Sequence, residues 1–242
     1  MSGHSKWSQI KRQKGAADIK RGQTFTKIAN AITIAVREGG GVTDPNQNFR
    51  LRLIIDRAKT VNMPKENIER AISRALSKKE SGDLEEITYE GFGPRGISVM
   101  IEAATDNRLR TQAEIKHIFE KAGGSLGQPG SVAYQFKKMG MVVVKKDKMS
   151  FDDVFQKALE SGAEDLQDVN DEVFIYTDPV NLTKVKDALL RSGLEVVKAE
   201  LVQKPVATIS VEDSEQLQKI HFFIENLEEL EDVQKVFTNV KT

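Results

Sequence analysis

The spacing of apolar residues changes once along this chain, at residues 77–83, and no single class of secondary structure accommodates both patterns. Before that point, apolar residues recur at three- and four-residue intervals, which is the period of a helix with one buried side. After it, short apolar and alternating runs bounded by glycine, proline and polar residues are typical of strands. The sequence therefore predicts an α+β protein, with an N-terminal helical bundle, a polar hinge at residues 77–83 and α/β sequence beyond it.

Three helices are expected before the hinge. The first covers residues 16–38 and ends at Gly39-Gly40-Gly41, since glycine accepts the left-handed conformation of a helix C-cap. Asp44-Pro45 matches an N-cap followed by a first-turn proline, so the second helix is expected from there to about Val61. The third follows Met63-Pro64. Three amphipathic helices with short connections form a small bundle, and its outside would carry further cations: Arg50, Arg52, Arg57, Lys59, Lys65, Arg70 and Arg74.

Beyond the hinge, two ferredoxin-like α/β domains are expected, one inserted in the other. Residues 140–200 follow the complete pattern strand–helix–strand–strand–helix–strand, which is the split βαβ order. Further strand and helix segments follow it, so we expect this unit to be an insertion; a linear order of domains is the alternative. The surrounding domain would contain strands at 86–92, 97–104, 132–136, 207–211 and 233–237 and helices at 108–122 and 214–226. The expected domains are 1–79, 80–138 with 204–242, and 139–203.

Charge is strongly segregated, although 36 basic and 36 acidic residues balance over the whole chain. Residues 1–79 contain 17 Lys and Arg against 6 Asp and Glu, a net charge of +11, which leaves −11 on residues 80–242. Residues 1–28, which we term the basic ribbon, hold seven cations and the only tryptophan against one acid. Cations that displace counterions from phosphates add affinity for nucleic acid, and aromatic rings stack on bases. The candidate nucleic-acid-binding residues are therefore Lys6, Trp7, Lys11, Arg12, Lys14, Lys20, Arg21 and Lys27.

Alternatives remain at the basic ribbon. Charged runs also form solvated faces that bind nothing, although the opposite charges of the two parts of the chain favour one end that contacts nucleic acid. Trp7 would either stack on bases or pin the ribbon to the bundle. We expect the pinned arrangement, because a single tryptophan usually buries most of its surface.

The residue pattern does not indicate an enzyme. The chain has no cysteine, which excludes disulfides and thiolate metal sites, and it contains no P-loop, nucleophile elbow or metal-ligand spacing. His4, His117 and His221 are isolated in sequence, and the glycines of residues 90–96 lie between two strands, which indicates a hairpin rather than a dinucleotide site. We expect no catalytic residue, metal or cofactor. No apolar run approaches the roughly twenty residues that span a bilayer, so no membrane is expected either.

The glycine-rich segment at residues 123–130 has two interpretations. Backbone amides without neighbouring side chains can approach a phosphate closely. Alternatively, the glycines end a helix and form a turn, which requires no ligand. The second interpretation is preferred because it requires no ligand, and the first remains open.

The order of several motifs resembles that of the YebC/PmpR family over essentially the whole chain. The resemblance begins with Gly3-His4-Ser5-Lys6-Trp7, Ile10-Lys11, Asp18, Lys20-Arg21-Gly22 and Phe25-Thr26-Lys27. It continues with Arg37-Glu38-Gly39-Gly40-Gly41, Asn62-Met63-Pro64, Asn67-Ile68-Glu69-Arg70-Ala71-Ile72, Tyr89-Glu90-Gly91-Phe92-Gly93-Pro94, Thr105-Asp106-Asn107-Arg108, Arg110-Thr111 and Gly130-Ser131-Val132-Ala133. Two departures are Gln128-Pro129 within the glycine loop and Tyr134, where many members carry tryptophan. Neither removes a cation.

The resemblance implies three domains, one helical and two α/β, and a transcriptional regulator that binds promoter DNA. The family also includes a mitochondrial translational activator and bacterial members that act on the ribosome. No targeting presequence precedes Gly3-His4-Ser5, which favours a bacterial cytoplasmic protein.

The expected function is that of a non-enzymatic nucleic-acid-binding regulator of gene expression. Promoter DNA is the first expected target, and ribosomal RNA on the ribosome is the alternative. Phosphate contacts carry no sequence information, so the basic ribbon does not separate the two. Neither the target sequence nor the oligomeric state follows from the residues.

Overall fold

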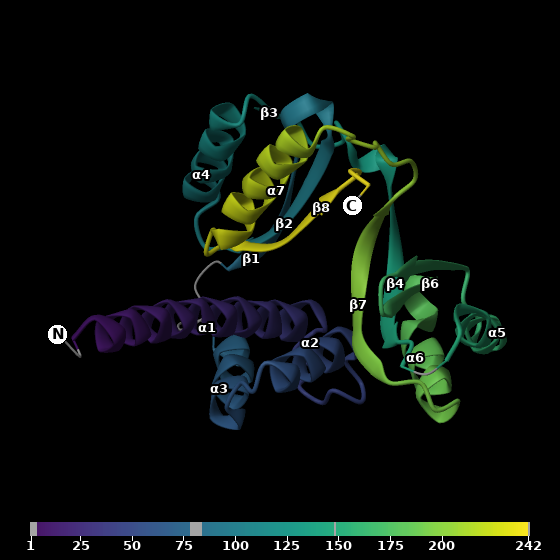
Figure 1. The fold of residues 1–242 in the computed structure, drawn as a ribbon. Coiled ribbons are helices and arrows are strands. Elements are labelled where there is room, and N and C mark those ends of the chain that lie inside the picture. The colour runs from purple at the N-terminus through teal and green to yellow at the C-terminus, as the bar shows by residue number, and fades with distance from the viewer. Residues whose placement is uncertain (1–3, 78–83, 148, 242) are drawn as a thin grey trace. The chain divides into compact units, whose positions relative to one another are not determined.

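The computed structural model describes residues 4–77, 84–147 and 149–241, with side chains described from Lys20 onward. Its helices and two four-stranded sheets confirm the expected mixture of helix and sheet (Figure 1). The chain divides into two compact units. One comprises Met1–Tyr89, Ile101–Ala122 and Ile220–Val236, and the other comprises Glu90–Met100, Gly123–Lys219 and Phe237–Thr242. The hinge expected at residues 77–83 lies almost wholly outside the described residues.

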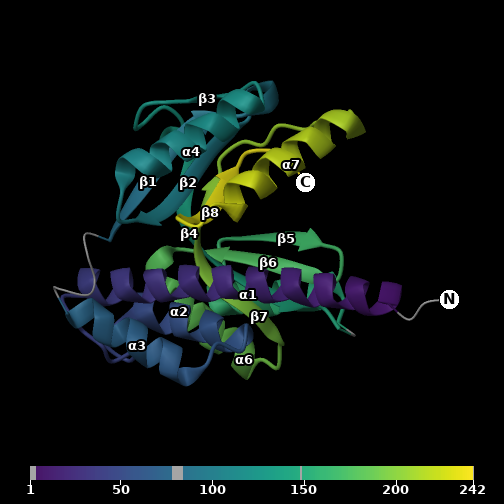
Figure 2. The same ribbon diagram turned by 90° about the vertical axis from the view of Figure 1, so that its left-hand side faces the viewer.

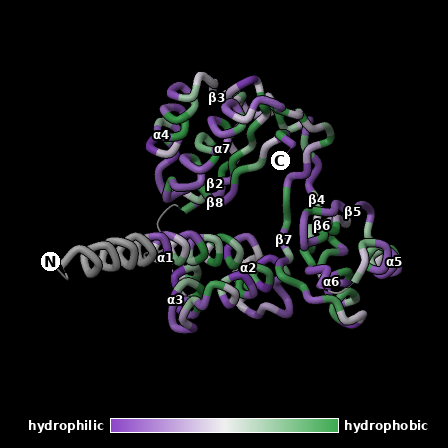
Figure 3. Tube along the Cα trace, viewed as in Figure 1, coloured by the Kyte–Doolittle hydropathy of each residue, from purple (hydrophilic) through white to green (hydrophobic). Residues whose placement is uncertain are grey.

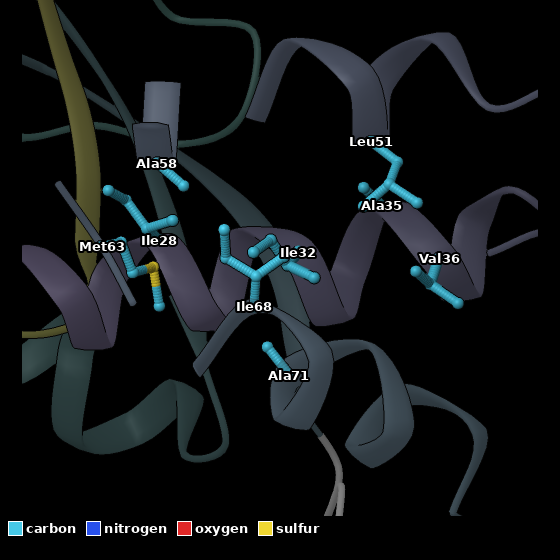
Figure 4. Close-up of a cluster of buried hydrophobic side chains, with 9 residues drawn as sticks. All are labelled: Ile28, Ile32, Ala35, Val36, Leu51, Ala58, Met63, Ile68 and Ala71. Atoms are coloured by element: carbon cyan, nitrogen blue, oxygen red, sulfur yellow. The ribbon is translucent and has the colours of Figure 1, made fainter. Parts of the chain in front are cut away.

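The N-terminal helices form a bundle around one apolar core. They are α1 (His4–Glu38), α2 (Phe49–Thr60) and α3 (Lys65–Leu76), and Figure 2 shows α1 as one long continuous helix. Figure 4 shows the core side chains that these helices and the α2–α3 connection contribute: Ile28, Ile32, Ala35, Val36, Leu51, Ala58, Met63, Ile68 and Ala71. Each apolar residue removed from water stabilises the fold by about 25 cal/mol per Å² of apolar surface. The expected three-helix arrangement is confirmed.

Two helix starts differ from expectation. α1 begins at His4, about three turns before residue 16, because the lysine, arginine and glutamine residues there favour helix and no proline interrupts it. α2 begins at Phe49, and its N-cap is Asn48 rather than Asp44. The side chain of Asn48 accepts the backbone N–H of Leu51 at 3.0 Å, whereas Asp44 caps only a turn.

The first sheet has the strand order β3-β1-β2-β8, with β1 (Glu85–Phe92), β2 (Ser98–Thr105), β3 (Ser125–Leu126) and β8 (Val233–Thr238). The helices α4 (Arg108–Lys121) and α7 (Ser214–Glu229) accompany it. They contact each other through the rings of Phe119 and Phe223, whose centroids are 5.0 Å apart at 86°. The last strand thus joins the sheet begun near residue 86, as expected.

The second sheet has the order β5-β6-β4-β7, and its three pairings are antiparallel. Its strands are β4 (Phe136–Lys145), β5 (Asp165–Val169), β6 (Glu172–Thr177) and β7 (Val196–Pro205), with helices α5 (Phe151–Ser161) and α6 (Leu182–Arg191). A Cβ at Gly140 would lie 2.8 Å from the Cβ of Leu182, so this glycine permits close packing of α6 on β4. Figure 3 shows hydrophobic residues along β4, β6 and β7.

Two expected strands are absent from the described structure. Residues 133–135 form a 3-10 helix instead of a strand, because the backbone N–H groups of Val132 and Ala133 donate to a carboxylate and not to a neighbouring strand. Residues 207–211 make only a single parallel bridge, between Ile209 and Val240.

Candidate nucleic-acid interface

All eight candidate residues lie on α1, and the structure describes the side chains of three of them. Lys6, Trp7, Lys11, Arg12 and Lys14 lie on its first three turns, and their side chains are outside the described residues. The stacking and anchoring roles of Trp7 therefore both remain predictions. The other three, Lys20, Arg21 and Lys27, follow within the next four turns.

Lys20 and Arg21 are exposed on α1. The side chain of Lys20 is 77% exposed, and its Nζ lies 3.9 Å from Oε1 of Glu229 at the end of α7. An ion pair between two exposed groups contributes at most about 1 kcal/mol, because water and salt screen it. A polyanion can therefore reach Lys20 at little cost.

Lys27 lies in a different environment. Its half-buried ammonium group donates a hydrogen bond to the backbone carbonyl of Glu228. Burial lowers the pKa of Lys27 below its ordinary value, and the carboxylates of Glu228, Glu229 and Glu231 partly oppose that shift. A phosphate that binds Lys27 would have to replace the Glu228 carbonyl.

Arg57 of α2 is a cation that the sequence did not place in the interface. It lies close enough to Lys27 to lower the pKa of that lysine further. Two helices therefore contribute positive charge to one place on the bundle. Helical periodicity assigns Arg57 to the outside of α2, but it carries no information on which residue of another helix lies opposite.

Several cations expected on the bundle surface also have structural roles. Arg50 pairs with Glu38 and Glu86, and Arg52 donates to the backbone carbonyls of Pro45 and Asn46 at 2.8 and 3.1 Å. Arg74 donates to Oδ1 of Asn30 at 2.7 Å and to Oγ1 of Thr33. All three are partly exposed on the bundle, and each guanidinium also ties together segments of the fold.

The last amide of the glycine loop and two amides just after it donate to a carboxylate of the chain itself. Backbone N–H groups of Gly130, Val132 and Ala133 each donate to the Glu90 carboxylate at 2.8 Å. Burial alone would raise the pKa of Glu90, but these three hydrogen bonds hold it below its ordinary value. Because Glu90 accepts these bonds, the structure favours the helix stop and turn for residues 123–130: α4 ends there, and Gly123 has a positive φ of 75°.

Asp232 is a second buried carboxylate that the sequence did not single out. Its Oδ2 accepts the hydroxyls of Thr105 and Thr111 at 3.1 and 2.6 Å and the Arg110 guanidinium at 2.8 Å. Burial acts to raise the pKa of Asp232, and these donors overcome it and lower that pKa. The Asn107 side chain caps α4 by accepting the N–H of Arg110. The motif around residues 105–111 thus fixes the start of α4 against the segment before β8.

Among the residues that the structure describes, no group of three His, Asp or Glu side chains could hold a metal ion. Within the same residues, no helix has an apolar stretch long enough to cross a membrane.

Two family models match this chain and together cover most of it. The model of the TACO1/YebC protein N-terminal domain matches residues 5–78, which contain the helical bundle. The model of the TACO1/YebC second and third domain matches residues 84–240, which contain both sheets.

Relatives match over nearly the full length. A probable transcriptional regulatory protein of Persephonella marina is 47% identical over 240 residues, which cover 99% of this chain and 95% of the relative. A protein with the same description from Finegoldia magna is 42% identical over 99% of this chain and 98% of its own length. The crystal structure of a conserved hypothetical protein from Aquifex aeolicus matches with a TM-score of 0.85 and 42% identity, covering 93% of this chain and 91% of that one.

Proposed function

Because this chain belongs to the TACO1/YebC family, we propose that it is a non-enzymatic, cytoplasmic regulator of gene expression that binds promoter DNA through α1. The observation that carries the proposal is the concentration of cations on that helix, with a net charge of +11 on residues 1–79 against −11 on the rest. Relatives that share 42–47% of its residues are described as probable transcriptional regulatory proteins.

The length of α1 suits contact with several phosphates at once. A helix of 35 residues is about 50 Å long, at 1.5 Å per residue, and the phosphates of one DNA strand are spaced closely enough for cations on several turns to reach them. Each neutralised phosphate releases counterions, which accounts for most nonspecific affinity for DNA. The proposed contacts are Lys6, Lys11, Arg12, Lys14, Lys20, Arg21 and Lys27, with Trp7 beside them.

The absence of enzymatic activity is part of the proposal. The buried carboxylates Glu90 and Asp232 accept several hydrogen bonds each from neighbouring groups of the fold, which supports a structural role for both. These hydrogen bonds outweigh the effect of burial, stabilise the ionised form of both carboxyls and leave neither poised to exchange a proton near neutral pH.

We further propose the arrangement of domains that supports this function: 1–79, 80–138 with 204–242, and an inserted domain at 139–203. The strand order β5-β6-β4-β7 with antiparallel pairings supports a ferredoxin-like insertion. The position of β8 beside β2 supports a surrounding domain that closes after the insertion.

Crosslinking in cells, followed by sequencing of the bound nucleic acid, tests the proposal. DNA upstream of transcribed genes should be enriched, and a variant with Lys11 and Arg12 changed to Glu should lose that enrichment. A variant with Lys184 and Arg191 of α6 changed to Glu carries the same charge change and should keep it. Recovery of ribosomal RNA without promoter DNA would assign the protein to translation instead.

A further inference from the structure

We propose that the acidic end of α7 occupies the basic face of α1 in the free protein and is displaced when nucleic acid binds. The term "acidic end of α7" denotes Glu228 and Glu229 of the helix together with Glu231 just after it. The inference rests on the proposed function, since it requires that Lys20 and Lys27 contact phosphates. In this proposal the acidic end of α7 competes with nucleic acid for the same cations.

Contacts from two successive acidic residues join the acidic end of α7 to α1. The Glu229 carboxylate lies 3.9 Å from the ammonium group of Lys20, and the Glu228 carbonyl accepts a hydrogen bond from that of Lys27. The carboxylates of Glu228, Glu229 and Glu231 all favour the charged form of Lys27. The two cations lie seven residues apart, about two turns of one helix, so they present one face.

The local chemistry of α7 does not account for these acids. Unpaired carbonyls make the C-terminal end of a helix negative, so acidic residues there are unfavourable and basic ones are preferred. The last turn of α7 has no basic residue, although Glu228 and Glu229 lie in it. The compensating positive charge comes from Lys20 and Lys27, more than 200 residues earlier in the chain. Residues that are unfavourable in their own helix, and whose charge is balanced by residues far away in the sequence, are typical of functional positions.

The groups that the acidic end offers resemble those of a phosphate. Carboxylate oxygens are charged hydrogen-bond acceptors, as phosphate oxygens are, and a carbonyl oxygen is an acceptor with partial negative charge. The pair between Lys20 and Glu229 is exposed on both sides, with side chains 77% and 65% exposed, so salt weakens it readily. A DNA duplex offers many phosphates along α1 at once and therefore competes successfully.

The first experiment compares the full-length protein with the variant E228Q/E229Q/E231Q in binding a 30-base-pair duplex at low salt. Removing three competing charges should tighten binding about tenfold, the effect of a few weak ion pairs. The control variant E160Q/D187N/E212Q changes net charge equally, at exposed residues without a side-chain partner among those described, and should tighten binding about twofold or less. Glutamine at a helix C-terminus removes an unfavourable charge, so the variant should fold.

The second experiment detects the contact directly. A carbodiimide activates a carboxylate for attack by a nearby lysine amine, which forms an amide bond with overall loss of water. Mass spectrometry of the treated wild-type protein should detect a Lys20–Glu229 crosslink, and saturating duplex should reduce its yield several-fold.

The outcomes separate the two proposals. Equal affinity gains in both triple variants, or a crosslink yield that duplex leaves unchanged, would overturn the displacement while the wild type still binds duplex. Failure of wild type and variants alike to bind any duplex would overturn the proposed function, and the displacement with it.

Discussion

At the scale of residues, Glu90 shows how one carboxylate can hold a loop without a ligand. The residue is 7% exposed, and it accepts three backbone hydrogen bonds from a segment forty residues later in the chain. Without the carboxylate, the buried N–H of Val132 would have no acceptor and those of Gly130 and Ala133 would lose theirs, and a buried unsatisfied donor is costly. Glu90 therefore stabilises the path from the end of α4 to the start of β4.

The change Glu90→Gln should destabilise the protein by about 2–3 kcal/mol, because an amide has one accepting oxygen and no charge to offer three donors. Urea unfolding followed by circular dichroism measures this. Glu114→Gln, at an exposed position of α4, is the matched control and should change the free energy of unfolding by less than about 0.5 kcal/mol. Equal stability of the two variants would contradict the role of Glu90.

Acid stability should depend on the same residue. The folded-state pKa of Glu90 is lowered by its hydrogen bonds, so its contribution is present above the unfolded pKa of about 4.3 and is lost as pH falls through the folded pKa. The pKa of Asp232 is also lowered in the folded state, so this carboxylate contributes to acid stability in the same direction. The free energy of unfolding of the wild type should therefore decline below about pH 4.5, and that of Glu90→Gln should decline less steeply. Parallel curves for the two proteins would contradict this account.

At the scale of elements, the joint between α1 and α2 depends on Asn48. Its Oδ1 caps α2, while its Nδ2 donates to the carbonyls of Ala35 at 2.8 Å and Val42 at 3.0 Å. A Cβ at Gly39 would lie 2.4 Å from that Nδ2, so only glycine leaves room for the amide. One side chain thus forms hydrogen bonds with backbone groups at the end of α1, in the connection and at the start of α2.

Asn48→Ala should lower the free energy of unfolding by about 2–3 kcal/mol, since it removes an N-cap and leaves two carbonyls without their donor. Thermal unfolding measures the loss. Asn46→Ala in the same connection changes an exposed side chain and should cost less than about 0.5 kcal/mol. A similar melting temperature for both variants would show that the cap is dispensable.

The elements also show where sequence patterns are sufficient. Helical spacing predicted three amphipathic helices, and Ile28, Ile32 and Ile68 lie in the core that they form, because burial of one side imposes that period. The early start of α1 could not be predicted in this way, since residues 4–15 carry almost no apolar stripe. Asn48 and Glu90 escaped prediction for a different reason: each acts through partners that only the folded chain brings close.

At the scale of the whole molecule, positive charge is gathered at the N-terminal end and acidic residues predominate elsewhere. The basic ribbon could be predicted from composition alone, because its cations are contiguous in the sequence. Arg57, which lies near Lys27 on another helix, and the acidic end of α7 could not, because only tertiary contacts bring them to the proposed interface. The proposed interface is therefore partly a property of one segment and partly of the fold.

The salt dependence of duplex binding tests the central claim, that α1 holds phosphates, most directly. Log affinity should fall linearly with log salt for the wild type, and the variant K11E/R12E should bind more weakly with a slope about two units shallower, since each lost phosphate contact removes about 0.9. The control K184E/R191E, with the same charge change on α6, should keep the wild-type slope. A folded K11E/R12E variant with unchanged affinity and unchanged slope would contradict the claim.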